Sequence, residues 1–144
     1  MIEGDSLTAQ LCAAGMMVDG DPSAALACFV RAWEARRDAY EASIAAHFLA
    51  RQQSTAEDRL HWNEVAAARA ESVPGDRAQP LLASLYLNLS DSYLTVGRLA
   101  EATSAAERGN TALRHLPAEG YGAFVAQGLA RLRSRLAELS EPPP

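Results

Sequence analysis

Turn-forming residues divide this chain into segments of helical length, and apolar residues recur every three or four positions within each segment. The breaks include Asp19-Gly20-Asp21-Pro22, Pro74-Gly75-Asp76 and Pro117-Ala118-Glu119-Gly120. Gly and Pro interrupt regular structure, and a spacing of three and four places apolar side chains on one face of an α-helix. The pattern therefore predicts seven helices in antiparallel order, joined by short turns.

The composition excludes a β fold. Alanine occurs 30 times and leucine 18 times in the 144 residues, whereas valine and isoleucine together occur 8 times. Alanine and leucine favour helices, and strands need β-branched residues. We expect an all-α protein with one domain at residues 6–139, an N-terminal tail at 1–5 and a disordered tail at 140–144, where three prolines cannot continue a helix.

Several helix ends can be placed from their capping residues. Ser6 can cap the first helix, and Thr55 or Ser54 can cap a helix that carries Trp62. Pro22 suits the first turn of the second helix. We expect further helices over residues 38–52, 78–96 (which Gly97 ends) and 120–139.

Two stretches of the chain align with each other. Gly20-Asp21-x-x-x-Ala25-x-x-x-Phe29-x-x-Ala32 matches Gly97-Arg98-x-x-x-Ala102-x-x-x-Ala106-x-x-Gly109. Upstream of these stretches, Tyr86-x-x-Leu89-Ser90-x-x-Tyr93 matches Ala9-x-x-Cys12-Ala13-x-x-Met16 in the size of its side chains.

The aligned stretches resemble the tetratricopeptide repeat, a 34-residue helix–turn–helix unit. The resemblance implies a right-handed α-α superhelix of three helix pairs, at about residues 6–37, 38–76 and 77–117, with a capping helix at 120–139. The chain also resembles small bacterial tetratricopeptide proteins, in segments such as Tyr40-Glu41-Ala42 and His61-Trp62-Asn63. That likeness implies a role in binding proteins or peptides and implies no catalytic residues.

Charge and motif content exclude several classes of function. The formal charge of −5 disfavours a nucleic-acid binder, and the absence of lysine excludes a P-loop. We expect a cytoplasmic protein, because we find neither a secretory signal nor an apolar run long enough to span a membrane. Two cysteines are too few for a disulfide scaffold, and we expect no metal and no cofactor.

The resemblance also implies which side chains face the concave groove of the superhelix, because the first helix of each pair lines it. The candidates for contact with a partner are Met17 in the first repeat, Tyr40, His47 and Arg51 in the second, and Leu87, Asn88 and Asp91 in the third. His47 and Arg51 are four residues apart and share a helix face, where Arg51 could hold a carboxylate in a bidentate fork.

His47, Arg51 and the tryptophans also have a structural interpretation. Arg51 could pair with Glu57 or Asp58 while His47 packs between helices. Trp62 could anchor a partner or belong to the core, and Trp33 could fill a gap between repeats. The remaining charges are expected on solvated helix faces or too far apart for a tight phosphate site; they include Glu34, Glu41, Glu64, Arg131, Arg133 and Arg135.

Three functions remain open at this stage. The leading expectation is a non-catalytic adaptor that binds a protein or peptide in the groove. The first alternative is a subunit that forms a homodimer through its cap helix, whose apolar stripe comprises Phe124, Leu129, Leu132 and Leu136. The second is an enzyme or small-molecule sensor with a pocket around His47, Arg51 and Trp62, although no recognisable catalytic motif accompanies these residues.

Overall fold

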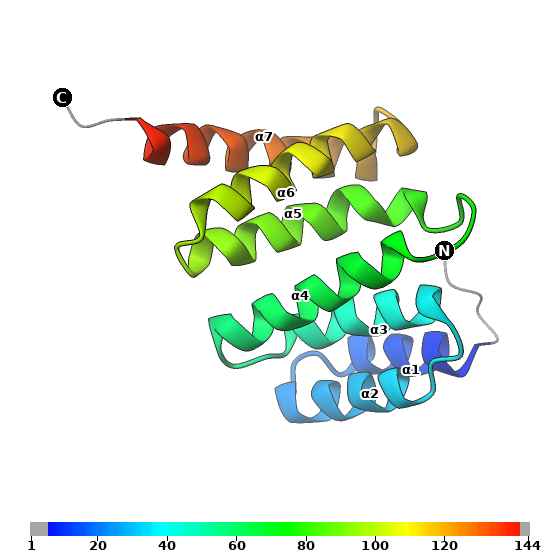
Figure 1. The fold of residues 1–144 in the computed structure, drawn as a ribbon. Helices are drawn as coiled ribbons and strands as arrows, with labels where there is room; N and C mark the ends of the chain where they lie inside the picture. The colour runs from blue at the N-terminus through cyan, green and yellow to red at the C-terminus, as the bar shows by residue number, and fades with distance from the viewer. Residues whose placement is uncertain (1–5, 142–144) are drawn as a thin grey trace. The chain divides into compact units, whose positions relative to one another are not determined.

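The computed structural model describes residues 6–141, and these form α-helices, one 3-10 turn and no strand (Figure 1). The prediction of an all-α protein is thereby confirmed. The predicted tail at residues 1–5 and the last three prolines lie outside the described residues. The helices are α1 (Leu7–Met17), α2 (Pro22–Glu34), α3 (Ala39–Arg51), α4 (Ala56–Glu71), α5 (Gln79–Thr95), α6 (Leu99–Ala112) and α7 (Tyr121–Ser140), with the 3-10 turn η1 (Leu113–His115) after α6.

Most helix ends follow the expected capping chemistry. The side chains of Ser6, Asp21, Asp38 and Thr55 each accept a hydrogen bond from a backbone N–H in the first turn of the helix that follows. These bonds satisfy donors that have no partner within the helix. Gly97 follows α5 with a φ of +81°, a left-handed conformation that glycine adopts without strain.

The chain divides after Ala78 into two compact units. In unit 1, α1 packs against α2, α3 packs against both of them, and α4 packs against α3. Its core joins two clusters of buried side chains, one around Leu11, Cys12, Ala32 and Ala45 and the other around Ala25, Phe29 and Leu49. Burial raises the pKa of the Cys12 thiol to about 12, so this cysteine serves as a small apolar core residue.

Unit 2 repeats the packing of the first three helices. α5 packs against α6, and α7 packs against both of them. Its core contains one cluster of Ala83, Ala112, Val125 and Leu129, and another of Ala102, Ala106, Leu132 and Leu136. Buried alanines on α5 and α6 let the large side chains of α7 enter between these two helices.

The internal match of the second helices holds in three dimensions. Ala25, Phe29 and Ala32 of α2 are buried, and so are their counterparts Ala102, Ala106 and Gly109 of α6. A buried hydroxyl also joins the two helices of each hairpin. Thr8 donates a hydrogen bond to the Ala32 carbonyl at 3.0 Å, and Ser90 donates one to the Ala102 carbonyl at 2.6 Å. The two hydroxyl bonds lie at different positions of the hairpins, since Ala32 matches Gly109 and Ala102 matches Ala25, so the likeness rests on the matched burial in α2 and α6.

The proposed alignment of the first helices is wrong by one residue. The sequence pattern placed Ala13 and Met16 at packed positions, yet both are exposed. The buried face of α1 consists instead of Thr8, Ala9, Leu11, Cys12 and Gly15. Gly15 determines this register, because only a residue without a side chain fits against the ring of Phe29.

We predict that Gly15→Ala destabilises the protein. A Cβ at this position would overlap the Phe29 ring, which is buried and stacked on Phe48. Overpacking costs about 1–3 kcal/mol, which offsets the gain of up to ~1 kcal/mol expected for alanine over glycine in a helix. Urea denaturation should show a lower midpoint than wild type.

Gly20→Ala is the matched control, because a Cβ at Gly20 meets no atom within 4 Å and Gly20 does not have a positive φ. Its stability should equal or exceed that of wild type. If Gly15→Ala were as stable as Gly20→Ala, the packing account of the α1 register would be wrong.

Candidate functional site

The predicted contact residues of α3 differ in accessibility. Tyr40 is only 1% exposed, and the guanidinium of Arg77 lies 3.9 Å from the centre of its ring. His47 is half-buried and meets the Phe48 ring edge-on, with 5.1 Å between ring centres. Arg51 is exposed, with its guanidinium carbon 5.7 Å from the centre of the same Phe48 ring. Phe48 is thus the shared neighbour of His47 and Arg51.

The surroundings of His47 hold it in the neutral form. Burial lowers its pKa to about 4, and the positive charge of Arg51 acts in the same direction. A neutral imidazole is consistent with the packing interpretation of this residue. Among residues 6–141, however, Arg51 forms no ion pair with Glu57 or Asp58, so the pairing suggested by the sequence does not occur.

Both tryptophans belong to the packing of unit 1. Trp62 of α4 packs against the cluster of Ala25, Phe29 and Leu49. Its ring meets that of Trp33 edge-on, with 5.1 Å between ring centres. The structure therefore supports the core interpretation of Trp62 and the gap-filling interpretation of Trp33.

Met17, the predicted contact residue of the first repeat, lies at the end of α1 and is 85% exposed.

A buried carboxylate corrects the expectation that Glu41 lies on a solvated face. Glu41 is 2% exposed and accepts hydrogen bonds from the guanidinium of Arg37 (2.6 and 2.9 Å), from the Arg37 backbone N–H (3.0 Å) and from the Ser6 hydroxyl (3.2 Å). These bonds tie the N-terminus of α1 to that of α3. They also lower the pKa of Glu41, Arg37 contributing most. The network is structural, because the carboxylate is covered.

The predicted residues of α5 line a pocket together with α7. Leu87, Asn88 and Asp91 lie on the α5 wall with Leu94, and the α7 wall comprises Gly128, Arg131, Leu132 and Arg135. The hollow measures about 500 Å³, which is within the ~300–1,000 Å³ range of ligand sites. The structure therefore brings the three α5 candidates together, and it adds two arginines that the sequence reasoning did not select.

Helix geometry explains why the arginines were missed. Arg131, Arg133 and Arg135 alternate along the chain, and neighbours two apart do not share a helix face. Arg131 and Arg135 are four apart and do share one, which was the signal that could have identified them. Among the described residues, neither of them forms an ion pair with Asp91, and Arg135 has only a 3.9 Å pairing with Glu138.

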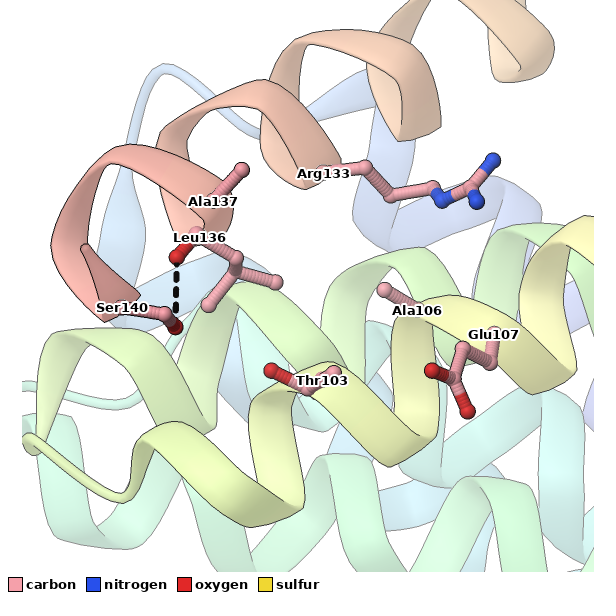
Figure 2. A pocket seen from close by; sticks show the side chains of 7 residues that line it. All are labelled: Thr103, Ala106, Glu107, Arg133, Leu136, Ala137 and Ser140. Carbon is pink, nitrogen blue, oxygen red and sulfur yellow. Dashed lines mark hydrogen bonds between the residues drawn. The ribbon is translucent and has the colours of Figure 1, made fainter.

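Arg133 lines a different hollow on the other flank of α7. This α6–α7 groove is bordered by Thr103, Ala106 and Glu107 of α6 and by Arg133, Leu136, Ala137 and Ser140 of α7 (Figure 2). Its volume is about 200 Å³. The Ser140 hydroxyl donates to the Leu136 carbonyl at 2.8 Å, a bond within α7 itself.

The described part of the chain contains neither a metal-binding cluster nor a membrane-spanning helix. Residues 6–141 contain no group of three or more His, Cys, Asp or Glu side chains that could hold a metal ion. None of their helices is long and apolar enough to cross a bilayer. Comparisons of the chain with protein-family models, curated proteins and solved structures find no match.

We predict that His47 titrates near pH 4. Its ordinary pKa is 6.5, and the folded protein lowers this value. The unfolded chain therefore binds a proton between pH 6.5 and 4 that the folded protein does not, so folding stability falls as the pH falls through this window. NMR titration of the His47 ring should give a midpoint near 4; a midpoint of 6 or above would show that the ring is solvated.

We predict that Glu41→Gln loses about 1.5–3 kcal/mol of stability at pH 7, the range for hydrogen bonds to a charged group. The pKa of Glu41 is lowered on folding, so its contribution is complete above the ordinary value of 4.5 and declines as the pH falls below it. Denaturation of both proteins at pH 7 and pH 3.5 should show a smaller difference at the lower pH. Glu57→Gln, at an exposed glutamate, should change stability by less than about 0.5 kcal/mol.

Proposed function

We propose that this protein is a non-catalytic module that binds a protein or peptide partner on the concave face of a tetratricopeptide-like superhelix. The proposed architecture is right-handed, with three helix pairs and α7 as the cap. The evidence for this architecture comes from packing within each of the two units. In each unit the helix that follows the first hairpin packs on both helices of that hairpin, as stacked repeats require. Buried small residues also recur at matching positions of α2 and α6.

One observation carries the functional part of this proposal. The three α5 residues that the repeat pattern assigns to the groove, Leu87, Asn88 and Asp91, line one pocket of ligand-binding size. In a stack of helix pairs, the first helices of successive pairs line the same face. α5 and α7 are the first helix of the third pair and the cap that succeeds it, so the pocket between them lies where the proposed architecture puts a partner.

The chemistry of the pocket favours a partner that carries a carboxylate. Two arginines and one aspartate leave a net positive lining, and each guanidinium can hold a carboxylate in a bidentate fork. Leu87, Leu94 and Leu132 provide apolar contacts beside the charges. An extended peptide with an acidic side chain or a free C-terminus matches this combination.

Phe124 extends the same surface. It lies four residues before Gly128 and seven before Arg131, so all three share one face of α7. Phe124 is 65% exposed, whereas the other members of the predicted apolar stripe, Leu129, Leu132 and Leu136, are buried. An exposed aromatic side chain beside a charged pocket suits the anchoring of an apolar side chain of the partner.

We predict that Arg131→Gln and Arg135→Gln each weaken partner binding by roughly 10- to 100-fold, since a hydrogen bond to a charged group contributes about 1.5–3 kcal/mol. The partner would be selected from a displayed peptide library with free C-termini. Its affinity for wild type and each variant would then be measured by calorimetry.

Arg133→Gln is the matched control, because it removes the same charge from the same helix outside this pocket. It should change the affinity less than about twofold. Failure to enrich any peptide, or equal weakening by all three substitutions, would refute the proposal that this pocket binds the partner.

A further inference from the structure

In unit 1, a helix covers the groove that forms between the first hairpin and the helix after it. There, α4 packs on α3, and its Trp62 reaches the cluster formed by Ala25 and Phe29 of α2 and Leu49 of α3. The edge-on contact with Trp33 fixes the Trp62 ring in that position. One large side chain from an amphipathic helix therefore fills the groove between α2 and α3.

The corresponding groove of unit 2 is open. The match between α2 and α6 pairs Leu26, Phe29 and Val30 with Thr103, Ala106 and Glu107. These three α6 residues are the ones that border the α6–α7 groove. α7 corresponds to α3, since each follows a hairpin and packs on both of its helices. Among the described residues, no helix follows α7 in the position that α4 takes after α3.

The lining of the α6–α7 groove specifies what it can accept. Ala106, Leu136 and Ala137 are apolar, and the hydroxyls of Thr103 and Ser140 already donate to carbonyls of their own helices at 2.9 and 2.8 Å. A volume of about 200 Å³ is below the usual range of small-molecule sites and suits one large side chain.

Two opposite charges flank this hollow. Glu107 belongs to α6 and Arg133 to α7, and Figure 2 shows both side chains at the same end of the groove, away from Ser140. Within residues 6–141 neither of them forms an ion pair. Each is therefore available to a group of opposite charge on an incoming helix.

We propose that the α6–α7 groove docks an amphipathic helix from a partner protein, in the way that α4 covers the groove of unit 1. The helix places one large apolar side chain between the accessible Thr103 and Ala137, above the buried Ala106 and Leu136, with a base near Glu107 and an acid near Arg133. A second copy of α7 fits less well, because its Leu129, Leu132 and Leu136 are already buried in the clusters of unit 2 and cannot fill a second groove. This surface lies on the other flank of α7 from the carboxylate-binding pocket.

The first test uses a blocked peptide of residues 55–72, which spans α4. We choose α4 because it covers the corresponding groove of unit 1. The peptide would be titrated into the full-length, ¹⁵N-labelled chain. We expect amide shifts at Thr103, Ala106 and Ala137. A peptide with Trp62→Ala should bind at least tenfold more weakly, because it lacks the side chain that fills the hollow. Shifts confined to unit 1, or no shifts at millimolar peptide, would overturn the proposal.

Ala137→Trp fills the groove from its rim, and Ala130→Trp is the matched control, since both alanines are exposed on α7 and only Ala137 borders the groove. Ala137→Trp should weaken peptide binding at least tenfold, and Ala130→Trp less than twofold. Circular dichroism would establish that both variants fold. Equal affinities of the two variants would contradict docking in this groove.

A charge reversal gives a second test that adds no bulk. Arg133→Glu should lower the affinity of the chain for the α4 peptide at low salt. It should leave the affinity of a carboxylate-bearing peptide for the α5–α7 pocket unchanged, and this difference separates the present proposal from the proposed function. Sedimentation of the chain alone tests the other occupant. A dimer that Ala137→Trp dissociates would assign the groove to a second copy and overturn the assignment to a partner helix.

Discussion

The close approach of neighbouring helices is the constraint on which the rest of this structure depends. Two helices can pack this tightly only where one of them presents alanine, glycine or a small hydroxyl residue at the crossing. Ala25 and Ala32 serve this purpose in α2, and Ala102 and Gly109 do so in α6. The large side chains are consequently concentrated on the partner helix of each contact, as Leu129, Leu132 and Leu136 are on α7.

The same constraint determined which features could be predicted from the sequence. Helix number, helix ends and the match of α2 with α6 follow from local signals, namely apolar spacing, capping side chains and turn residues. The register of α1 does not follow from local signals, because alanine occurs on both the buried and the exposed face of this helix and cannot indicate which face is inside. A single contact between Gly15 and Phe29 decides the register, and that contact joins two helices.

The site was predictable to the extent that it lies on one helix. Leu87, Asn88 and Asp91 follow one face of α5, so the repeat pattern alone could group them. The opposite wall depends on which flank of α7 meets α5, and this is a property of the packed unit. Glu41 shows the same limit, since its burial arises from Arg37 and Ser6, which lie on segments that come together only in the fold.

α7 illustrates how helical periodicity places like side chains on two different surfaces of one helix. Successive residues are separated by about 100° around a helix, so residues four apart share a flank and residues two apart lie on opposite flanks. Arg131 and Arg135 border the α5 side, and Arg133 borders the α6 side. Three arginines that resemble a single basic cluster in the sequence therefore lie on two separate surfaces. A last helix is suited to this arrangement because, among the described residues, no later helix packs on it and both its flanks remain accessible.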